Sequence, residues 1–323
     1  TSEIVPLRAP RPTEARVNPP VPRPAAFRKP RLLVIGCGDV GLRVLQQLQG
    51  RYRVRALSTE AGRKPTLRLV GALPLMGNLD QPQTLGRLGA LATRVLHLAP
   101  PPGTGQTDPR TRALLRALAR GGVTQRIVYG STSGVYGDAG GARFDETRRT
   151  APATLRACRR VDAEQQLRAH GRRHGVAVSL LRIPGIYAPG RAGGDPRERL
   201  ARGTPLLAVD DDVFTNHIHA DDLARACLLA LHRALPQRAL HINDDAEWRM
   251  GEYFDLAADL AGLPRAPRIV REQAAGLLSP MQLSFMSESR RLDNRRMKQE
   301  LGLRLRYPTP HEGLAPLRPP GKG

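Results

Sequence analysis

Aromatic residues and lysine are scarce in this chain of 323 residues. Tyr, Phe and Trp make up only 4% of it, which leaves little for stacking on single-stranded bases. Lys and Arg total 51 and the formal net charge is +22, yet only Lys29, Lys64, Lys298 and Lys322 are lysines. The arginines are spread along the chain, without a helix-turn-helix signature or a basic strand motif that carries aromatics. We therefore expect no specific nucleic-acid partner.

Cysteine and long apolar stretches are also scarce. The three cysteines, Cys37, Cys158 and Cys227, are widely spaced, and no Cys/His spacing resembles a zinc site. No run of about 18 apolar residues predicts a membrane span. The first residues contain no apolar segment followed by a small-residue cleavage site, so no signal peptide is predicted. Together these absences predict a cytoplasmic protein with reduced thiols, no metal and no membrane partner.

Proline is concentrated at one end of the chain. Eight prolines fall within residues 1–30, where apolar periodicity is almost absent. This composition predicts a disordered Pro/Arg-rich tail, and residues 316–323 are predicted to form a second flexible tail. Between the tails, a content of 40% hydrophobic residues is sufficient for a sizeable core.

Short apolar strands alternate with helical patterns along the first half of the chain. Strands are predicted at 32–35, 51–58, within 71–80, and at 94–102, 125–138 and 176–190, with helices at 110–122 and 154–170 between them. This alternation predicts an α/β fold with a Rossmann-type doubly wound parallel sheet.

The pattern loosens after residue 190. We predict a Rossmann domain at 31–190, with 213–243 returning to the sheet, and a smaller C-terminal substrate lobe from 191–212 and 244–315. Asp221 and Asp222 stand where the helix after residue 219 begins, and we expect them to cap it.

A glycine-rich turn follows the first strand. Gly36, Gly38 and Gly41 form GxGxxG between a strand and a helix. The first glycine permits a tight turn, the second lets the backbone approach a pyrophosphate, and the third packs helix against strand. The first helical residues, Asp39 and Val40, present free N–H groups to phosphate. A dinucleotide site is predicted; the alternative is a tight turn in a domain that has lost its ligand.

The end of the second strand indicates which dinucleotide is bound. An NAD site places Asp or Glu there to bind the ribose 2′-OH, whereas this strand ends at Ser58 and is followed by Arg63 and Lys64. A hydroxyl followed by two cations suits a 2′-phosphate, so NADP is favoured. Glu60 keeps NAD open, and Arg63 and Lys64 could equally belong to a solvated loop.

Five further segments occur in an order that resembles a known family. They are GNLD (77–80), HLAPPP (97–102), STSGVYGD (131–138), LLRIPGIYAPG (180–190) and NHIHADDLARA (216–226). From about residue 31 to 315 the chain resembles the extended short-chain dehydrogenase/reductases, the NAD(P)-dependent epimerase/dehydratase family. The resemblance implies further cofactor contacts at Asn78, where Asp is usual, and at Leu79, Leu98, Ala99, Pro100 and Pro184.

The same resemblance implies catalytic positions, and two of them are altered. The family's Ser/Thr falls on Thr132, whereas the Tyr and Lys of its YxxxK pair fall on Arg156 and Arg160. Arginine cannot shuttle protons at ordinary pH. Arg160 could replace the lysine at the ribose, Arg156 could bind a carboxylate or phosphate of the substrate, and Tyr136 is a candidate proton source.

Several alternatives remain open from the sequence. Arg160, Glu164 and Arg168 are spaced as a surface ion-pair ladder on one helix face, which would give the arginines a structural role. The favoured function is an NAD(P)-dependent oxidoreductase or epimerase-like enzyme with an altered active site, acting on an unidentified small hydroxyl or carbonyl metabolite. The alternatives are an NADP(H)-binding sensor or scaffold without turnover and a nucleic-acid-associated protein. A homodimer through this helix, as in the family, is also left open.

Overall fold

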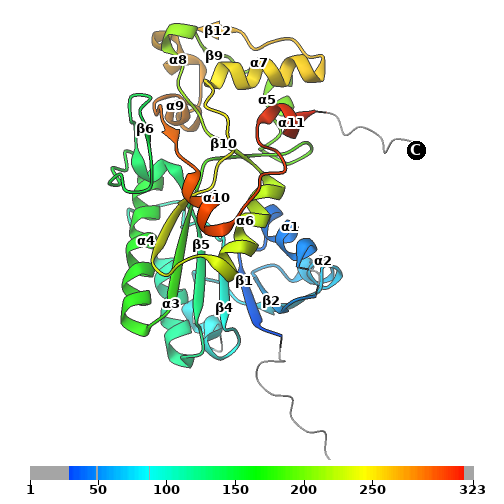
Figure 1. The fold of residues 1–323 in the computed structure, drawn as a ribbon, viewed down its shortest axis with the longest axis vertical. Coiled ribbons are helices and arrows are strands. Elements are labelled where there is room, and N and C mark those ends of the chain that lie inside the picture. The colour runs from blue at the N-terminus through cyan, green and yellow to red at the C-terminus, as the bar shows by residue number, and fades with distance from the viewer. Residues whose placement is uncertain (1–28, 49, 87, 316–323) are drawn as a thin grey trace, which may run out of the picture.

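A seven-stranded parallel sheet forms the centre of the computed structural model, which describes residues 29–48, 50–86 and 88–315. The strand order is β11-β7-β5-β4-β1-β2-β3 (Figure 1). The predicted tails lie outside the described residues, apart from Lys29 and Pro30. The strands are β1 (Arg31–Ile35), β2 (Arg53–Ser58), β3 (Ala72–Met76), β4 (Arg94–His97), β5 (Arg126–Thr132), β7 (Ala177–Ile183) and β11 (Arg238–His241).

Helices cover both faces of this sheet (Figure 1). On one face lie α1 (Asp39–Gln47) and α6 (Ala220–Arg233), and on the other lie α3 (Pro109–Gly121) and α4 (Leu155–His174). Leu32 and Val34 of β1 pack in the apolar core beneath α1 and α6, and Leu33 and Ile35 pack in the core beneath α3 and α4. Burial on both faces explains why this strand is a continuous apolar run instead of an alternating one. The predicted α/β doubly wound sheet is therefore confirmed.

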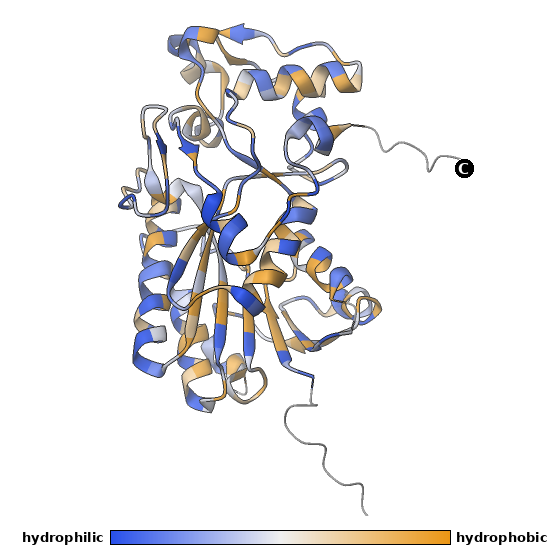
Figure 2. Ribbon diagram, viewed as in Figure 1, coloured by the Kyte–Doolittle hydropathy of each residue, from blue (hydrophilic) through white to orange (hydrophobic). Residues whose placement is uncertain are grey.

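A smaller lobe lies beyond the carboxyl ends of the strands and has its own apolar core (Figure 2). Its helices are α5 (Pro196–Ala201), α7 (Met250–Ala261), α8 (Arg271–Leu277), α9 (Pro280–Met286) and α11 (Pro310–Leu314). Its strand pair is β9 (Leu206–Leu207) with β12 (Arg268–Ile269). No helix in the described part of the chain is both long and apolar enough to span a membrane.

Shorter elements connect the two parts. Strand β8 (Gly185–Tyr187) pairs with β10 (His217–His219), and β6 (Arg143–Phe144) pairs with β13 (Arg291–Leu292). Within 213–243, α6 and β11 pack in the sheet layers, whereas β10 pairs outside the seven-stranded sheet. The remaining helices are α2 (Lys64–Leu69), α10 (Arg295–Leu301) and the short 3-10 turns η2 (Ala61–Arg63), η3 (Pro82–Leu85), η4 (Leu88–Ala90), η5 (Ser133–Tyr136) and η6 (Val209–Asp211).

The start of α6 corrects one expectation. His219 is its N-cap and accepts the N–H of Asp221, so neither aspartate caps the helix. Asp221 instead binds Arg43 of α1, with Nη1 2.6 Å from Oδ1. The buried Asp222 accepts the backbone N–H groups of 306–307. The helix begins one residue earlier than expected, and this leaves both carboxylates free to bind other elements.

Candidate functional site

The glycine turn after β1 is held against the end of β4. Gly36 has a φ of +80°, and a Cβ added to it would lie less than 3.0 Å from the backbone of Ala99. Leu98 and Ala99 both donate their N–H groups to the carbonyl of Ile35, at 2.8 and 3.1 Å. Gly41 is also crowded, since a Cβ there would lie 3.2 Å from Sγ of Cys37. Only glycine satisfies both the positive φ and the close approach at position 36.

The second glycine faces open space. A Cβ added to Gly38, the N-cap of α1, would meet no atom within 4 Å. No side chain caps this helix, whose first turn contains Asp39 and Val40. The N-terminal N–H groups of a helix need an acceptor and favour an anion. The space above Gly38 and the uncapped helix end therefore fit a dinucleotide pyrophosphate.

Arg63 reaches this turn from η2. Its Nη2 lies 2.6 Å from the carbonyl oxygen of Cys37, inside the GxGxxG segment. The Ser58 hydroxyl, at the end of β2, bonds only to the backbone of Glu60. The structure thus brings a guanidinium to the turn, and the last residue of β2 carries a hydroxyl instead of a carboxylate.

The segments for which the resemblance implies further cofactor contacts include Asn78, Leu79, Ala99 and Pro100. Two of their polar groups, the Asn78 side chain and the Pro100 carbonyl, already form hydrogen bonds within the protein. Leu79 is buried in the same core cluster as Ala99. The Asn78 carboxamide oxygen accepts the N–H of Asp80, within its own turn. Asp80 forms an ion pair with Arg110, which also donates to the carbonyl of the exposed Pro100. The Asn78 side chain is thus fixed by a bond within its own turn.

Arg160, to which the resemblance assigns the lysine position, points to the sheet. Its Nη1 lies 2.9 Å from the Tyr129 hydroxyl and 2.7 Å from the carbonyl oxygen of Gly130, both on β5. Its guanidinium also lies over the Tyr129 ring, 5.5 Å from the centroid. The cation is thus held beside the carboxyl end of β5, two residues before Thr132.

Thr132 lies at the carboxyl end of β5, and Arg156 lies in the first turn of α4. Thr132 ends β5, and its hydroxyl accepts the N–H of Gly134. It pairs in register with Ile183 of β7, and Pro184 follows directly, half-buried. Arg156 is exposed, one helical turn before Arg160, and its guanidinium lies 4.9 Å from the ring centroid of Phe285 on α9. Arg156 thus lies between α4 and the smaller lobe.

Glu164 belongs to a buried polar network. Its carboxylate accepts from Ser131, at 2.6 Å, and forms a two-pronged ion pair with Arg182, at 2.7 and 3.2 Å. Arg182 also donates to the Tyr136 hydroxyl at 2.6 Å, and that hydroxyl lies 2.6 Å from Nε2 of His241. The network links α4, β5, β7, β11 and the turn after β5. These contacts could not be predicted from the sequence, because each joins residues from elements that are far apart along the chain.

The network corrects two expectations. Tyr136 has no exposed surface, and burial raises the pKa of its hydroxyl to about 12 although Arg182 lies beside it. This placement does not support its candidate role as a proton source. The alternative, a surface ion-pair ladder, is not formed, because Arg160 binds the sheet, Glu164 binds Arg182, and Arg168 donates to the carbonyl of Gln237 at 2.9 Å.

The histidines near the sheet edge are buried and neutral. His97 lies 3.0 Å from Thr111 Oγ1, and burial, with a smaller effect of the Arg160 charge, lowers its pKa to about 3. His217 stacks on Tyr253 with 3.9 Å between ring centroids, and burial lowers its pKa to about 3. The described residues include no group of three His, Cys, Asp or Glu side chains that could hold a metal ion.

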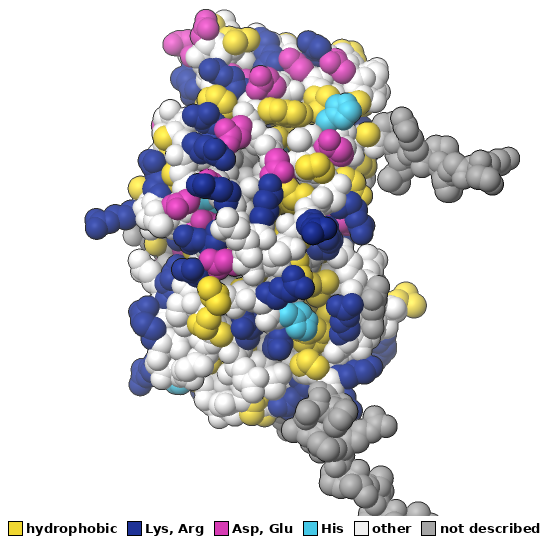
Figure 3. Space-filling model, in the orientation of Figure 1, with side chains coloured by type: hydrophobic (Ala, Val, Ile, Leu, Met, Phe, Trp, Pro, Cys, Tyr) yellow, Lys and Arg dark blue, Asp and Glu magenta, His cyan; other side chains and the backbone are white. Residues whose placement is uncertain are grey.

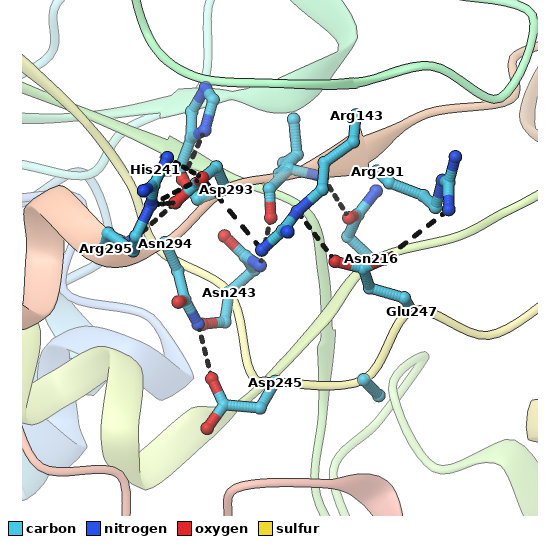
Figure 4. Close-up of polar contacts among 12 residues, drawn as sticks. Arg143, Asn216, His241, Asn243, Asp245, Glu247, Arg291, Asp293, Asn294 and Arg295 are labelled. Carbon is cyan, nitrogen blue, oxygen red and sulfur yellow. Dashed lines mark hydrogen bonds and ion pairs between the residues drawn. The ribbon is translucent and has the colours of Figure 1, made fainter.

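A second polar cluster joins the smaller lobe to the sheet (Figure 4). Arg143 of β6 and Arg291 of β13 both contact Glu247, at 2.9 and 3.6 Å. Asn294 donates to Asp245 at 2.7 Å, just beyond β11. These contacts hold the segment before α10 against the end of β11, so the cluster has a structural role at the edge of the site.

One ion-pair chain near the glycine turn could not be predicted from the sequence. Asp39 pairs with Arg191, at 3.0 Å, in the loop after β8, and with Arg43, at 3.1 Å, on its own helix. Arg43 continues to Asp221 at the start of α6. The chain connects the turn that fits a pyrophosphate to the loop that leads into the smaller lobe.

Comparison with known proteins agrees with this geometry. A model of the NAD dependent epimerase/dehydratase family matches residues 32–243. The chain is 27% identical to a UDP-glucose 4-epimerase of Azospirillum brasilense over 245 residues, covering 62% of this chain and 68% of that one.

Solved structures show the same fold. A conserved protein of unknown function from Silicibacter pomeroyi superposes with a TM-score of 0.73 and 30% identity, over 88% of this chain and 96% of that one. A UDP-glucose 4-epimerase from Thermotoga maritima, solved with UDP-glucose, gives a TM-score of 0.71 and 21% identity over the same shares. The chain therefore belongs to the NAD-dependent epimerase/dehydratase family, as an NAD(P)-dependent enzyme of the extended short-chain dehydrogenase/reductase type.

Proposed function

We propose that this protein is an NADP(H)-dependent oxidoreductase or epimerase-like enzyme that acts on a small hydroxyl- or carbonyl-bearing metabolite through an altered active site. The observation that carries the proposal is the glycine turn, where Gly38 opens on free space before an uncapped helix. Arg63 at the same turn, with Ser58 ending β2, supports a 2′-phosphate and thus NADP.

Arg160 replaces the family's lysine as the cation of the site. It is anchored on the Gly130 carbonyl and the Tyr129 hydroxyl, which leaves the rest of its fork for ribose hydroxyls. A bound nicotinamide supplies the hydride chemistry, and the protein contributes position and electrostatics.

The substrate side rests on Thr132 and Arg156. Thr132 offers a hydroxyl at the end of β5 to orient a substrate oxygen, and the exposed Arg156 binds an anionic group of the substrate. With Tyr136 buried and arginine at position 156, the described site residues include no tyrosine acid, so water is the proton source. Positioning of the reactants then accounts for the rate.

Calorimetric titration with NADPH and, separately, NADH tests the cofactor site. We expect micromolar binding of NADPH and weaker binding of NADH. Arg63→Ala should weaken NADPH binding more than NADH binding, because both lose the hydrogen bond that holds the Cys37 carbonyl of the turn and only NADPH also loses a 2′-phosphate contact. Arg160→Ala should weaken the binding of both. If neither dinucleotide binds at millimolar concentration, the proposed function is wrong.

Gly38→Ala separates binding from folding. Its Cβ would stand in the open space where the pyrophosphate approaches, and the φ of −79° suits alanine. We expect an unchanged melting temperature and at least tenfold weaker NADPH binding. Equal NADPH affinity in wild type and variant would show that the turn does not hold the cofactor.

A second candidate is an NADP(H)-binding protein without turnover. The buried Tyr136 and the arginines at the YxxxK positions favour it. A screen of aldehydes, ketones and sugar derivatives for accelerated NADPH oxidation distinguishes the two candidates. Acceleration that is lost in Thr132→Val supports the enzyme, and tight binding with no acceleration across the screen supports the second candidate.

A further inference from the structure

The net charge of +22 has no role in the proposed function, and although the arginines are spread along the chain, four of them line one groove. Between α3 and α4 lies a cavity of about 540 Å³, on the side of the sheet opposite α1 and α6. Arg112, Arg116 and Arg120 line it from α3 at a spacing of four residues, and Arg173 lines it from α4. All four are exposed. We call this feature the α3–α4 groove.

These arginines have no acidic partner among the described residues. Helix α3 contains no Asp or Glu, and α4 contains only Asp162 and Glu164. Glu164 is buried against Arg182, and Asp162 accepts from the N–H of Asp108 and from Gln166. The positive charge of the groove is therefore uncompensated by its own helices.

The side chains of the groove indicate what could lie in it. Residues four apart on a helix lie about 6 Å apart along one face, so the α3 arginines form a row of cations. A guanidinium fork fits phosphate oxygens. The groove includes no Phe, Tyr or Trp, and its apolar residues are Leu115, Ala119 and Ala169. It therefore lacks the large apolar anchors typical of protein interfaces, and the rings in its lining are those of His170 and His174, with centroids 4.5 Å apart.

We infer that the α3–α4 groove binds the phosphate backbone of nucleic acid, without sequence preference. Phosphate contacts position a nucleic acid but carry no sequence information, in agreement with the absence of a recognition motif. Two copies that met groove to groove would bring eight arginines together, so a symmetric contact between copies through this face is disfavoured. Basic side chains also outnumber acidic ones away from the groove, as on the lower part of the face shown in Figure 3, so the field of the whole molecule attracts polyanions.

The test uses the full chain and a fluorescently labelled 20-nucleotide single-stranded DNA of mixed sequence. Fluorescence anisotropy measures its affinity between 50 and 200 mM salt. We expect binding that weakens steeply with salt, and equal affinity for a second, unrelated sequence. Arg112→Ser, Arg116→Ser and Arg173→Ser combined should weaken binding at least tenfold. They should also reduce the slope of log K against log salt by about 2, because each phosphate contact contributes about 0.7.

A matched variant carries the same loss of charge elsewhere. Arg68, Arg149 and Arg202 are exposed residues on other elements, and all three are replaced by serine. We expect this control to keep the wild-type salt slope, with both variants checked for unchanged thermal melting. Equal weakening in the two variants would assign the binding to overall charge and overturn the inference. Failure of wild type to bind the DNA at 50 mM salt would do the same.

Two further results would contradict the inference. Poly-L-glutamate and unlabelled DNA can be compared as competitors by the concentration of negative charge that displaces the labelled DNA. If poly-L-glutamate displaces it at the lower concentration, the groove binds an acidic protein instead. A wild-type dimer that dissociates in the groove variant would make the groove an interface between copies. Because NADPH binding is measured separately, these outcomes leave the proposed function untouched.

Discussion

Glu164 is the residue that balances the buried charge of Arg182. Both side chains are almost fully buried, with 5% and 6% of their surface exposed. Removing one partner of a buried ion pair leaves an uncompensated charge, which destabilises proteins by about 3–5 kcal/mol. We therefore expect Glu164→Ala to lower the free energy of unfolding, measured with urea, by about this amount.

An exposed pair provides the control for this prediction. Asp259 and Arg265 pair at 2.7 Å on the surface, where solvent screens the interaction. Asp259→Ala should leave the urea midpoint unchanged. If Glu164→Ala and Asp259→Ala shift the urea midpoint equally, the Glu164–Arg182 pair does not stabilise the protein as a buried ion pair.

Gly36 is constrained twice, by its φ and by its contact with Ala99. Gly105 has nearly the same φ, +79°, but faces open space. Alanine at either position accepts a left-handed conformation that costs about 1–2 kcal/mol. Only Gly36→Ala also forces overlap with backbone, which adds about 1–3 kcal/mol. Urea unfolding should therefore show a larger loss for Gly36→Ala than for Gly105→Ala, and equal losses would refute the close contact.

The residues that the sequence predicted well belong to local patterns. Gly36 and Gly38 are identified by the strand, turn and helix around them, whereas Thr132 is assigned through the family resemblance and its role stays a prediction. The burial of Tyr136 could not be predicted, because its partners Arg182 and His241 lie 46 and 105 residues away. The spacing of charged residues on one helix likewise suggested a surface ladder through Glu164 as an alternative. In the structure this carboxylate is buried and pairs with Arg182 of β7.

At the scale of elements, α3 packs against η4 through two glycines. A Cβ on Gly121 would lie less than 3.0 Å from the backbone of Gly89. Alanine normally stabilises a helix relative to glycine, by up to about 1 kcal/mol. Here we expect Gly121→Ala to destabilise the protein by about 1–3 kcal/mol, because α3 must move away from η4. Urea unfolding of this variant checks the sign; a gain in stability would show that α3 and η4 are not in close contact.

The elements themselves were largely predictable. Strands buried on both faces appear as apolar runs, and α4 is bounded by Thr154, which caps it, and Gly175, with a φ of 65°. Helix α2 was not predicted, since its six residues carry only one buried side chain, Leu67. The pairing of β10 with β8 could not be predicted either, because register between short strands depends on the chain around them.

At the scale of the whole molecule, buried histidines make stability depend on pH. Burial lowers the pKa of His97, His217 and His241 to about 3, from the ordinary value of 6.5. Between these values the unfolded chain binds more protons than the folded protein, so stability falls as pH decreases below 6.5. Each histidine contributes a slope of up to about 1.4 kcal/mol per pH unit.

Urea unfolding at pH 7.5, 6.0 and 5.0 measures this slope. His97→Gln removes one titrating group. The slope of unfolding free energy against pH should therefore fall by up to about 1.4 kcal/mol per pH unit, whatever the stability of the variant at pH 7.5. Gln106, which is exposed and carries no titrating group, gives the control variant Gln106→Ala, which should keep the wild-type slope. A slope that is the same in His97→Gln and wild type would show that His97 titrates normally.

Asp222 determines how much of the chain is needed to complete the fold. Its side chain is fully buried and accepts the N–H groups of Arg306 and Tyr307, at 2.9 and 2.8 Å. These donors come from a segment that follows the last strand of the sheet by more than 60 residues. A fragment that stopped after α10 would retain all seven strands, but Asp222 would lose both backbone donors of 306–307 and keep the Arg225 guanidinium of its own helix. The minimal autonomous folding unit therefore extends past Tyr307, and a truncation screen should place its boundary there, not at the end of β11.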